Sequence, residues 1–273
     1  MSGLSDLHIT AVNEATAVPQ TDIGHSWRLA LSPHAQPSRY ADAQLDDTHG
    51  RGRSDYRWQP TATKSVRLTL RARFSHPAVQ FSGTAGFGFW NAPFGDPSVP
   101  WPTLPQATWF FLASPHCDLP LAPLQADGSF APGRGWFANT LDTTRPRALA
   151  LAPLALPTLL ANRFTAVRRR WWPFVRQQLR LSYQQLDPEV DITKWHTYQL
   201  DWRKENCVFW VDGVPRLLTP HSPQGPLGFV CWLDNQYLVL TGHGRVRWGT
   251  APITTPQHLH LTDLTITTIS ETT

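Results

Sequence analysis

Proline is the feature that most restricts how this chain folds, because it occurs 25 times in 273 residues. Its ring lacks a backbone N–H and clashes with the preceding helical turn, so long helical bundles and coiled coils are excluded. Only 16% of the residues are charged, whereas 41% are hydrophobic and 13 are tryptophan. Such a chain can bury a large core, which excludes intrinsic disorder and favours one mostly β domain over residues 1–273.

Short segments in which apolar and polar residues alternate predict the strands. The clearest are 66–74 and 198–202, each with one apolar and one polar face. Further strands are expected at 206–212, 228–233, 236–241 and 258–269. The Asp-Gly pair at 212–213 is typical of a tight turn. Turn signals are spaced as in a sandwich or a barrel, so we predict an all-β fold.

The segment 143–186 departs from the rest of the chain in its charge. It contains eight arginines and no acidic residue, so it carries +8, and the remainder carries −4 because the net charge is +4. Nucleic-acid binding predicts basic residues in a recognisable groove-reading module, and none is visible. We therefore expect no nucleic-acid partner.

Within 148–183 the apolar residues recur every three or four positions, which predicts an amphipathic helix. They are Leu160, Phe164, Val167, Trp171, Val175 and Leu179. Pro173 is expected to kink or split this helix. We predict a basic helical insertion at 145–186. It is either a lid on the β domain or a contact with anionic membrane, in which Arg168, Arg169 and Arg170 reach the headgroups.

Two consecutive motifs resemble a known family. Residues 195–202 (WHTYQLDW) and 207–214 (CVFWVDGV) resemble a hairpin of concanavalin A-like jelly rolls, most closely that of laminarinase-like family 16 glycoside hydrolases. Weaker resemblances follow the family's order at 66–74, 86–90, 136–142 and 261–266. The resemblance covers about residues 60–270 apart from the insertion. It implies a concanavalin A-like β-jelly roll of two packed antiparallel sheets.

The strand that should carry the catalytic residues of that family lacks them. Family 16 hydrolases place nucleophile and acid/base in one strand as E-x-D-x-x-E, and such carboxyl groups lie about 5–5.5 Å apart in retaining enzymes. The corresponding strand here, 107–114 (ATWFFLAS), contains no Asp or Glu. The resemblance therefore implies the fold, and glycoside hydrolysis is not expected.

Three aspartates remain at the ends of strands expected to face the cleft: Asp118, Asp142 and Asp234. Among aromatic side chains, desolvation would raise the pKa of such a carboxyl group and suit it to donate a proton. Each aspartate could instead cap a loop. His116, two residues before Asp118, completes the best acid–base pair in the sequence.

The resemblance also places aromatic residues on the concave face or its rim. The expected ligand-binding residues are Trp90, Trp101, Trp109, Trp136, Trp232 and Asn139. Aromatic rings stack on sugars and equally enclose hydrocarbon. We therefore expect a non-hydrolytic binding protein for a glycan or for an apolar or amphipathic small molecule. The alternative is an intracellular enzyme with isomerase, cyclase or hydratase chemistry on a lipid or isoprenoid-like substrate.

Metal and location follow from weaker signals. Laminarinase-like jelly rolls often hold a structural calcium at an aspartate of the closing strand, and Asp263 matches that position. His258 and His260 share one strand face, a spacing that suits a transition metal, but we expect a surface pair. No other cofactor is expected. Residues 1–20 contain no lysine, no arginine and no apolar stretch, so we expect a cytoplasmic location, with peripheral membrane contact through 148–183.

Overall fold

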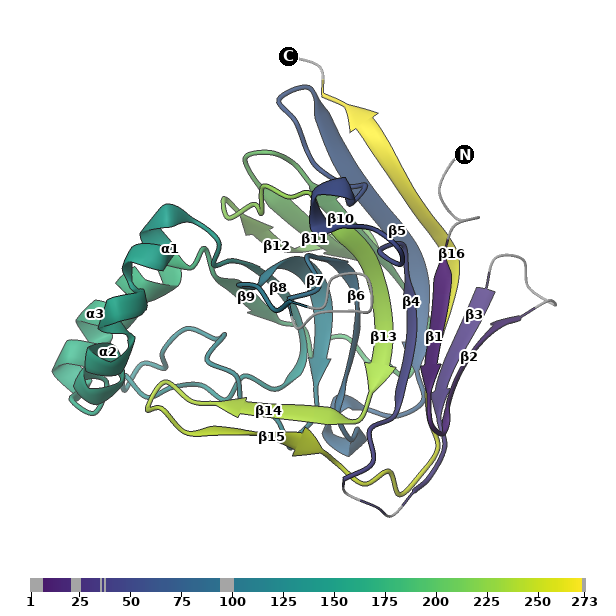
Figure 1. Ribbon diagram of the computed structural model, residues 1–273, viewed down its shortest axis with the longest axis horizontal. Helices are drawn as coiled ribbons and strands as arrows, with labels where there is room; N and C mark the ends of the chain where they lie inside the picture. Colours follow the sequence, from purple (N-terminus) through teal and green to yellow (C-terminus); the bar gives the residue numbers. More distant parts are fainter. Residues whose placement is uncertain (1–6, 21–25, 35, 37, 94–100, 272–273) are drawn as a thin grey trace.

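The computed structural model describes residues 7–20, 26–34, 36, 38–93 and 101–271. In these residues, two seven-stranded antiparallel sheets pack face to face as a sandwich, and a group of helices projects from one side (Figure 1). This confirms the predicted all-β, concanavalin A-like jelly roll with a helical insertion. We call the two sheets sheet A and sheet B.

The strands of each sheet are given in their spatial order. Sheet A consists of β1 (His8–Val12), β4 (Asp42–Asp46), β13 (Gly228–Asp234), β6 (Thr84–Trp90), β7 (Gln106–Ala113), β8 (Gly135–Asp142) and β9 (Ser182–Gln185). Sheet B consists of β12 (Val214–Thr219), β11 (Cys207–Val211), β10 (His196–Trp202), β5 (Lys64–Phe74), β16 (Gln257–Ser270), β3 (Ser26–Leu31) and β2 (Ala15–Gln20). A separate hairpin is formed by β14 (Gln236–Leu240) and β15 (Val246–Thr250).

The alternation seen in the sequence explains how the sheets pack. In β5 the buried side chains alternate with more exposed ones, so one face of sheet B turns to the core. The turn between β11 and β12 uses Asp212 and Gly213, both at positive φ (52° and 76°), as a type I′ hairpin requires. The core between the sheets is rich in aromatic side chains, and the largest wholly buried ones are Trp136, Trp202 and Tyr198.

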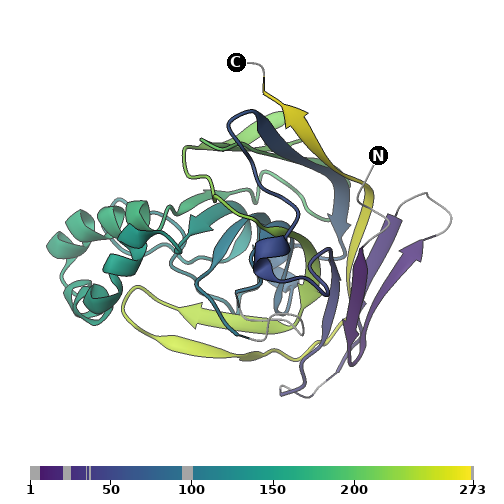
Figure 2. The ribbon, with the colours of Figure 1, turned by 45° about the horizontal axis from the view of Figure 1, so that its top comes forward.

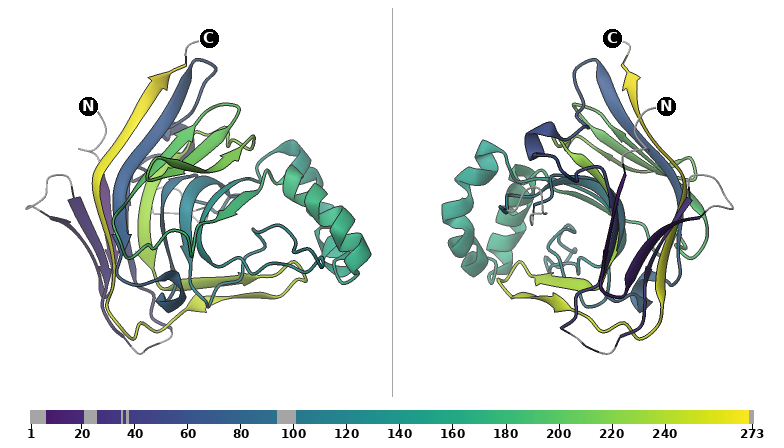
Figure 3. Two further views of the ribbon diagram at one scale, coloured as in Figure 1. Left: turned by 180° about the vertical axis from the view of Figure 1, so that it is seen from behind. Right: turned by 45° about the vertical axis from the view of Figure 1, so that its right-hand side comes forward.

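The helical insertion joins β8 to β9. It contains α1 (Pro146–Ala150), the 3-10 helix η4 (Ala152–Leu154), α2 (Ala155–Ala161) and α3 (Thr165–Gln178). Figure 2 shows these helices beside the sandwich rather than over its core. Both views of Figure 3 show the β14–β15 hairpin extending from the sandwich toward them. The hairpin reaches the insertion where the Asn162 side chain donates a hydrogen bond to the Gly242 carbonyl (2.7 Å).

The insertion differs from its sequence prediction in two respects. It is shorter, because the last residues of the expected range 145–186 form β9, which pairs with β8 in sheet A. Pro173 lies inside α3 without splitting it, and the break between helices falls at 162–164 instead. Pro173 is exposed, so its ring is accommodated on the outer side of the helix.

Candidate functional site

Two glycines of β6 make room for tryptophan rings on the concave face of sheet A, the face turned away from sheet B. Gly86 lies opposite Trp232, and Gly88 lies opposite Trp109. A Cβ atom at Gly86 would lie 2.7 Å from the Trp232 ring, and one at Gly88 would lie 2.6 Å from the Trp109 Cβ. The intervening phenylalanines point into the core, so the alternation in GFGFW sets both faces of this strand.

An aromatic cluster covers the middle of the concave face. The Trp109 ring centroid lies 5.2 Å from that of Trp232 and 6.3 Å from that of Trp90, and Phe111 packs 5.3 Å from Trp232. The Trp109 indole N–H donates to the Asn139 side-chain oxygen (3.0 Å). The structure therefore brings four of the six expected ligand-binding residues together. Trp109 and Trp232 are only 8% and 7% exposed, so they offer a ligand little more than ring edges.

Two expected ligand-binding tryptophans lie elsewhere. Trp136 is wholly buried between the sheets, with its ring centroid 5.1 Å from that of Phe74 and 5.7 Å from that of Tyr198. Its neighbour Phe137 takes the concave face, because successive side chains of a strand point to opposite faces. Trp101 is 80% exposed on a loop, outside the aromatic cluster. The prediction that Trp136 lines the cleft was therefore wrong.

Beside the aromatic cluster, two aspartates lie opposite each other on neighbouring strands. Asp42 of β4 pairs in register with Asp234 of β13, and Asp234 pairs in turn with Thr84 of β6. Oδ1 of Asp234 accepts hydrogen bonds from the Thr84 N–H (3.1 Å), the Thr84 hydroxyl (2.9 Å) and the Gln236 N–H (3.0 Å). Both aspartates are buried. We call them the carboxyl pair.

Burial holds protons on the carboxyl pair, and at Asp42 the charge of Asp234 adds to this effect. Burial, with the nearby charge of Asp234, raises the pKa of Asp42 from 3.8 to about 8. Burial raises the pKa of Asp234 from 3.8 to about 7, against the hydrogen bonds that it accepts. Burial and the charge of Asp42 also raise the pKa of Tyr40, which donates a hydrogen bond to that carboxyl group. Near neutral pH the pair can therefore hold and release a proton.

The other predicted acid–base residues do not join the carboxyl pair. Both oxygens of Asp142 are occupied: Oδ1 accepts from the Thr144 N–H and hydroxyl, and Oδ2 accepts from Arg145 (2.7 Å). Asp142 thus fits its loop-capping alternative. Asp118 accepts a hydrogen bond from the Gly133 N–H (3.4 Å) and lies beside β14. His116 is exposed and forms no hydrogen bond with Asp118.

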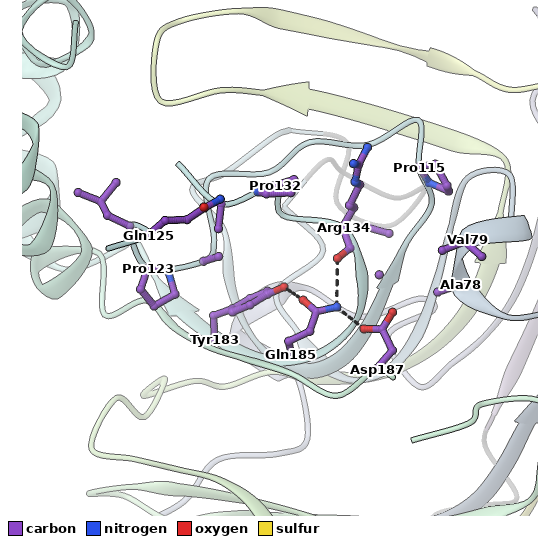
Figure 4. Close-up of a pocket in the computed structure, with 15 residues that line it drawn as sticks. Ala78, Val79, Pro115, Pro123, Gln125, Pro132, Arg134, Tyr183, Gln185 and Asp187 are labelled. Atoms are coloured by element: carbon purple, nitrogen blue, oxygen red, sulfur yellow. Dashed lines mark hydrogen bonds between the residues drawn. The ribbon is translucent and has the colours of Figure 1, made fainter. Parts of the chain in front are cut away.

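A pocket of about 760 Å³ adjoins the concave face at the ends of β7, β8 and β9 (Figure 4). Most of its lining is apolar and belongs to the loop 114–134, which supplies alanine, proline and leucine side chains. One side is polar: the Tyr183 hydroxyl donates to Gln185, whose amide donates to Asp187 and to the Arg134 carbonyl (3.3 Å). Burial raises the pKa of Tyr183, so its hydroxyl stays protonated.

Helix α3 fastens the loop that forms this pocket wall. The guanidinium groups of Arg168, Arg169 and Arg176 donate hydrogen bonds to the backbone carbonyls of Gly128, Ala126 and Leu121, respectively. Arg168 is buried and also lies over the Phe130 ring, 5.5 Å from its centroid. Burial lowers the pKa of Arg176 to about 10. The expectation that Arg168 reaches lipid headgroups was therefore wrong, because its side chain is buried against the loop.

The residues considered as metal ligands all lie on β16. Asp263 is exposed at a bulge of β16, with φ of 55°. His258 and His260 stack with ring centroids 6.1 Å apart. Among the described residues, no group of three or more His, Cys, Asp or Glu side chains lies close enough to hold a metal ion. Calcium also takes backbone carbonyl oxygens as ligands, so a calcium site at Asp263 stays a prediction.

Sequence reasoning missed the residues on both flanks of the aromatic cluster. Asp42 lies in the segment DAQLD, whose period of two puts its polar residues on one face and Ala43 and Leu45 on the other. That alternation in the sequence already indicates a strand at 42–46. Tyr183 and Gln185 belong to β9, a short strand without a clear apolar alternation that lay inside the expected helical range.

Comparisons with known proteins leave the family open. No protein-family model and no curated protein matches the chain. Similar solved structures include the endo-1,3-beta-glucanase from Streptomyces sioyaensis (11% identity, 99% of this chain and 91% of that chain, TM-score 0.46). They also include the Bacillus licheniformis beta-glucanase (12%, 100% and 95%, 0.44) and an alginate lyase in complex with dimannuronate (6%, 90% and 76%, 0.46). At TM-scores below 0.5, nothing about activity follows from these likenesses.

Proposed function

We propose that this jelly roll binds an amphipathic small molecule in the pocket beside the concave face, without cleaving glycosidic bonds. The observation that carries the proposal is the pocket's division into an apolar wall and one polar side. Its volume of about 760 Å³ is in the range of small-molecule sites, which are mostly apolar with a few placed polar groups. The apolar wall suits a hydrocarbon body, and the Tyr183–Gln185–Asp187 chain suits a polar end.

Filling the pocket tests the proposal. Ala131 lines the pocket and is half-buried, so Ala131→Trp places an indole in the space that the ligand needs. We expect the fluorescent fatty acid cis-parinaric acid to bind the wild type. It should bind this variant at least about tenfold more weakly, which corresponds to a loss of about 1.4 kcal/mol in binding free energy. The measurement is a fluorescence titration with purified protein.

A matched control makes the result specific. Ala11→Trp adds the same side chain at an exposed alanine of β1, which does not line the pocket. It should bind the probe as the wild type does. Equal binding by wild type and Ala131→Trp, with both proteins folded by circular dichroism, would place the probe elsewhere and refute the pocket as the site.

The carboxyl pair favours a second candidate function, acid–base catalysis on a lipid or isoprenoid-like substrate. A carboxylic acid that stays protonated near pH 7 can donate a proton to a substrate. Asp234 lies in one cross-strand row with Thr84 and Ala113, and Ala113 lines the pocket. Two strand spacings put Asp234 about 10 Å from that lining residue.

Deuterium exchange distinguishes the two candidates. An enzyme that protonates and deprotonates carbon should introduce deuterium into an isoprenoid such as farnesol in heavy water, as measured by mass spectrometry. Asp234→Asn should abolish the incorporation while leaving probe binding unchanged. No incorporation with the wild type would leave the binding function alone.

A further inference from the structure

The helical insertion exposes much more apolar surface than a lid packed on the sandwich would. Seven large apolar side chains of residues 146–178 are at least 42% exposed. They are Leu149, Leu154, Leu156, Leu160, Phe164, Val167 and Phe174. The side of α3 that packs inward is formed by Arg168, Trp172 and Val175 instead. Three of the six apolar residues in the sequence pattern, Leu160, Phe164 and Val167, are therefore exposed, whereas Val175 is buried.

An open groove runs between α2 and α3 on this exposed side. Its volume is about 520 Å³, and its lining includes Leu154, Pro157, Ala161, Val167, Arg170 and Trp171. The Trp171 indole N–H donates to the Thr158 hydroxyl (2.9 Å), which joins the two helices at the groove floor. Val167, Arg170 and Phe174 follow one another at spacings of three and four along α3, so they lie on one flank. We call this surface the arm face.

The charges of the insertion divide into inward and outward groups. Arg168 and Arg176 hold the pocket wall, and Arg145 pairs with Asp142 (2.7 Å). Arg147, Arg163 and Arg170 are exposed, and no hydrogen bond or ion pair to another described residue engages them. Because the insertion contains no acidic residue, every charge on its outward surface is positive.

We infer that the arm face docks on the surface of a membrane that contains anionic lipids. Exposed apolar side chains enter the boundary between headgroups and acyl chains, and arginine stems lie along that boundary while their guanidinium groups meet lipid phosphates. The uniformly positive arm face complements the uniformly negative surface of such a membrane. Docking is peripheral, because no helix in the described residues is both long enough and apolar enough to span a bilayer. The inference does not depend on what the pocket binds.

Co-sedimentation with lipid vesicles tests the inference. The wild type should bind vesicles of phosphatidylglycerol and phosphatidylcholine at least about tenfold more strongly than vesicles of phosphatidylcholine alone. Raising the salt from about 0.05 M to about 0.5 M should release it, because salt screens exposed charges. Equal binding to both vesicle types, or binding to neither, would overturn the inference.

Two charge variants locate the contact. Arg147→Gln, Arg163→Gln and Arg170→Gln together should reduce binding to anionic vesicles at least tenfold. The control, Arg71→Gln, Arg73→Gln and Arg247→Gln, removes the same charge from exposed positions outside the insertion and should bind as the wild type does. Equal loss in both variants would show that only net charge matters, and no loss in the first would place the contact elsewhere. Thermal unfolding of both variants verifies that they are folded.

The apolar part of the contact has its own variant. Leu156→Ser with Leu160→Ser removes two exposed leucines spaced one helical turn apart on α2 and leaves the charge unchanged. Binding to anionic vesicles should fall several-fold. Leu218→Ser, at a leucine of β12 that is 71% exposed, is the matched control and should change nothing. Wild-type binding by the double variant would contradict insertion of the arm face into the lipid boundary.

Discussion

At the scale of single residues, the carboxyl pair concentrates the unusual electrostatics of the concave face. Asp42 and Asp234 have pKa values raised to about 8 and about 7, mainly by burial. Between about pH 4 and pH 8 the folded protein therefore holds protons that the unfolded chain has released. The contribution of the carboxyl pair to the free energy of unfolding falls as the pH rises through this window and levels off above it.

Replacing Asp42 with asparagine should remove much of this pH dependence. Asparagine has the shape of the protonated acid and never acquires the buried charge. We expect the stability of Asp42→Asn relative to the wild type to be higher at pH 9 than at pH 5, by on the order of 2 kcal/mol. Thermal unfolding at the two pH values measures the difference.

Glu205→Gln controls for the loss of one negative charge, because Glu205 is exposed. It should shift stability little at either pH. If Asp42→Asn were instead destabilised to the same extent at pH 5 and pH 9, Asp42 would be ionised in the folded protein throughout, and the proton-holding pair would be ruled out.

The family resemblance placed the tryptophans of the concave face, and a resemblance locates a strand more securely than it fixes the strand's register. Trp109 and Trp232 lie on the concave face, as expected. Trp136 does not, because a shift of one residue in a strand exchanges the two faces. The sequence could not predict that Asp42 and Asp234 lie side by side, because these residues are 192 positions apart and only the pairing of β4 with β13 brings them together.

At the scale of elements, the apolar spacing of α3 predicts that a helix forms but does not show which side of the helix is buried. The apolar spacing predicted the element, and the structure confirms it. The spacing left open which side packs inward, and in the structure Arg168 turns inward to bond the carbonyls of Gly128 and Asn162 (2.5 and 2.7 Å). The sequence of a helix does not show that one of its side chains bonds the backbone carbonyl of a distant loop.

Removing the Arg168 guanidinium should loosen the pocket wall. Arg168→Met keeps an unbranched side chain but leaves two buried carbonyls without their donor, so we expect a loss of about 2–4 kcal/mol in the free energy of unfolding. Hydrogen exchange should become faster in the loop 119–134. Arg170→Met, at an exposed position of the same helix, should change neither quantity. Unchanged exchange in Arg168→Met would mean that the loop is held by other contacts.

At the scale of the whole molecule, the carboxyl pair lies away from the strand that carries the catalytic residues in family 16 hydrolases. Strand β7 presents Ala107, Trp109, Phe111 and Ala113 to the concave face, whereas the carboxyl pair lies on β4 and β13. A retaining glycosidase needs a nucleophile and an acid flanking the scissile bond. The centre of this face supplies neither.

We therefore expect no hydrolysis of β-1,3- or β-1,4-glucans, galactans or xyloglucan. The measurement is the release of reducing sugar over long incubations with protein freed of host glycosidases. Release above a buffer blank, and its loss in Asp234→Asn, would show instead that the carboxyl pair acts on glycans.

The direct pairing of β8 with β9 has a consequence for how such a molecule can change. Thr140 lies opposite Ser182, so everything between these strands is, topologically, the loop of a single hairpin. Because the entropy cost of closing a loop grows only slowly with its length, the sheet bears a long excursion nearly as readily as a short turn. The length of the insertion can therefore change at little cost to the pairing of β8 with β9, and what limits such a change is the contact that α3 makes with the loop 119–134.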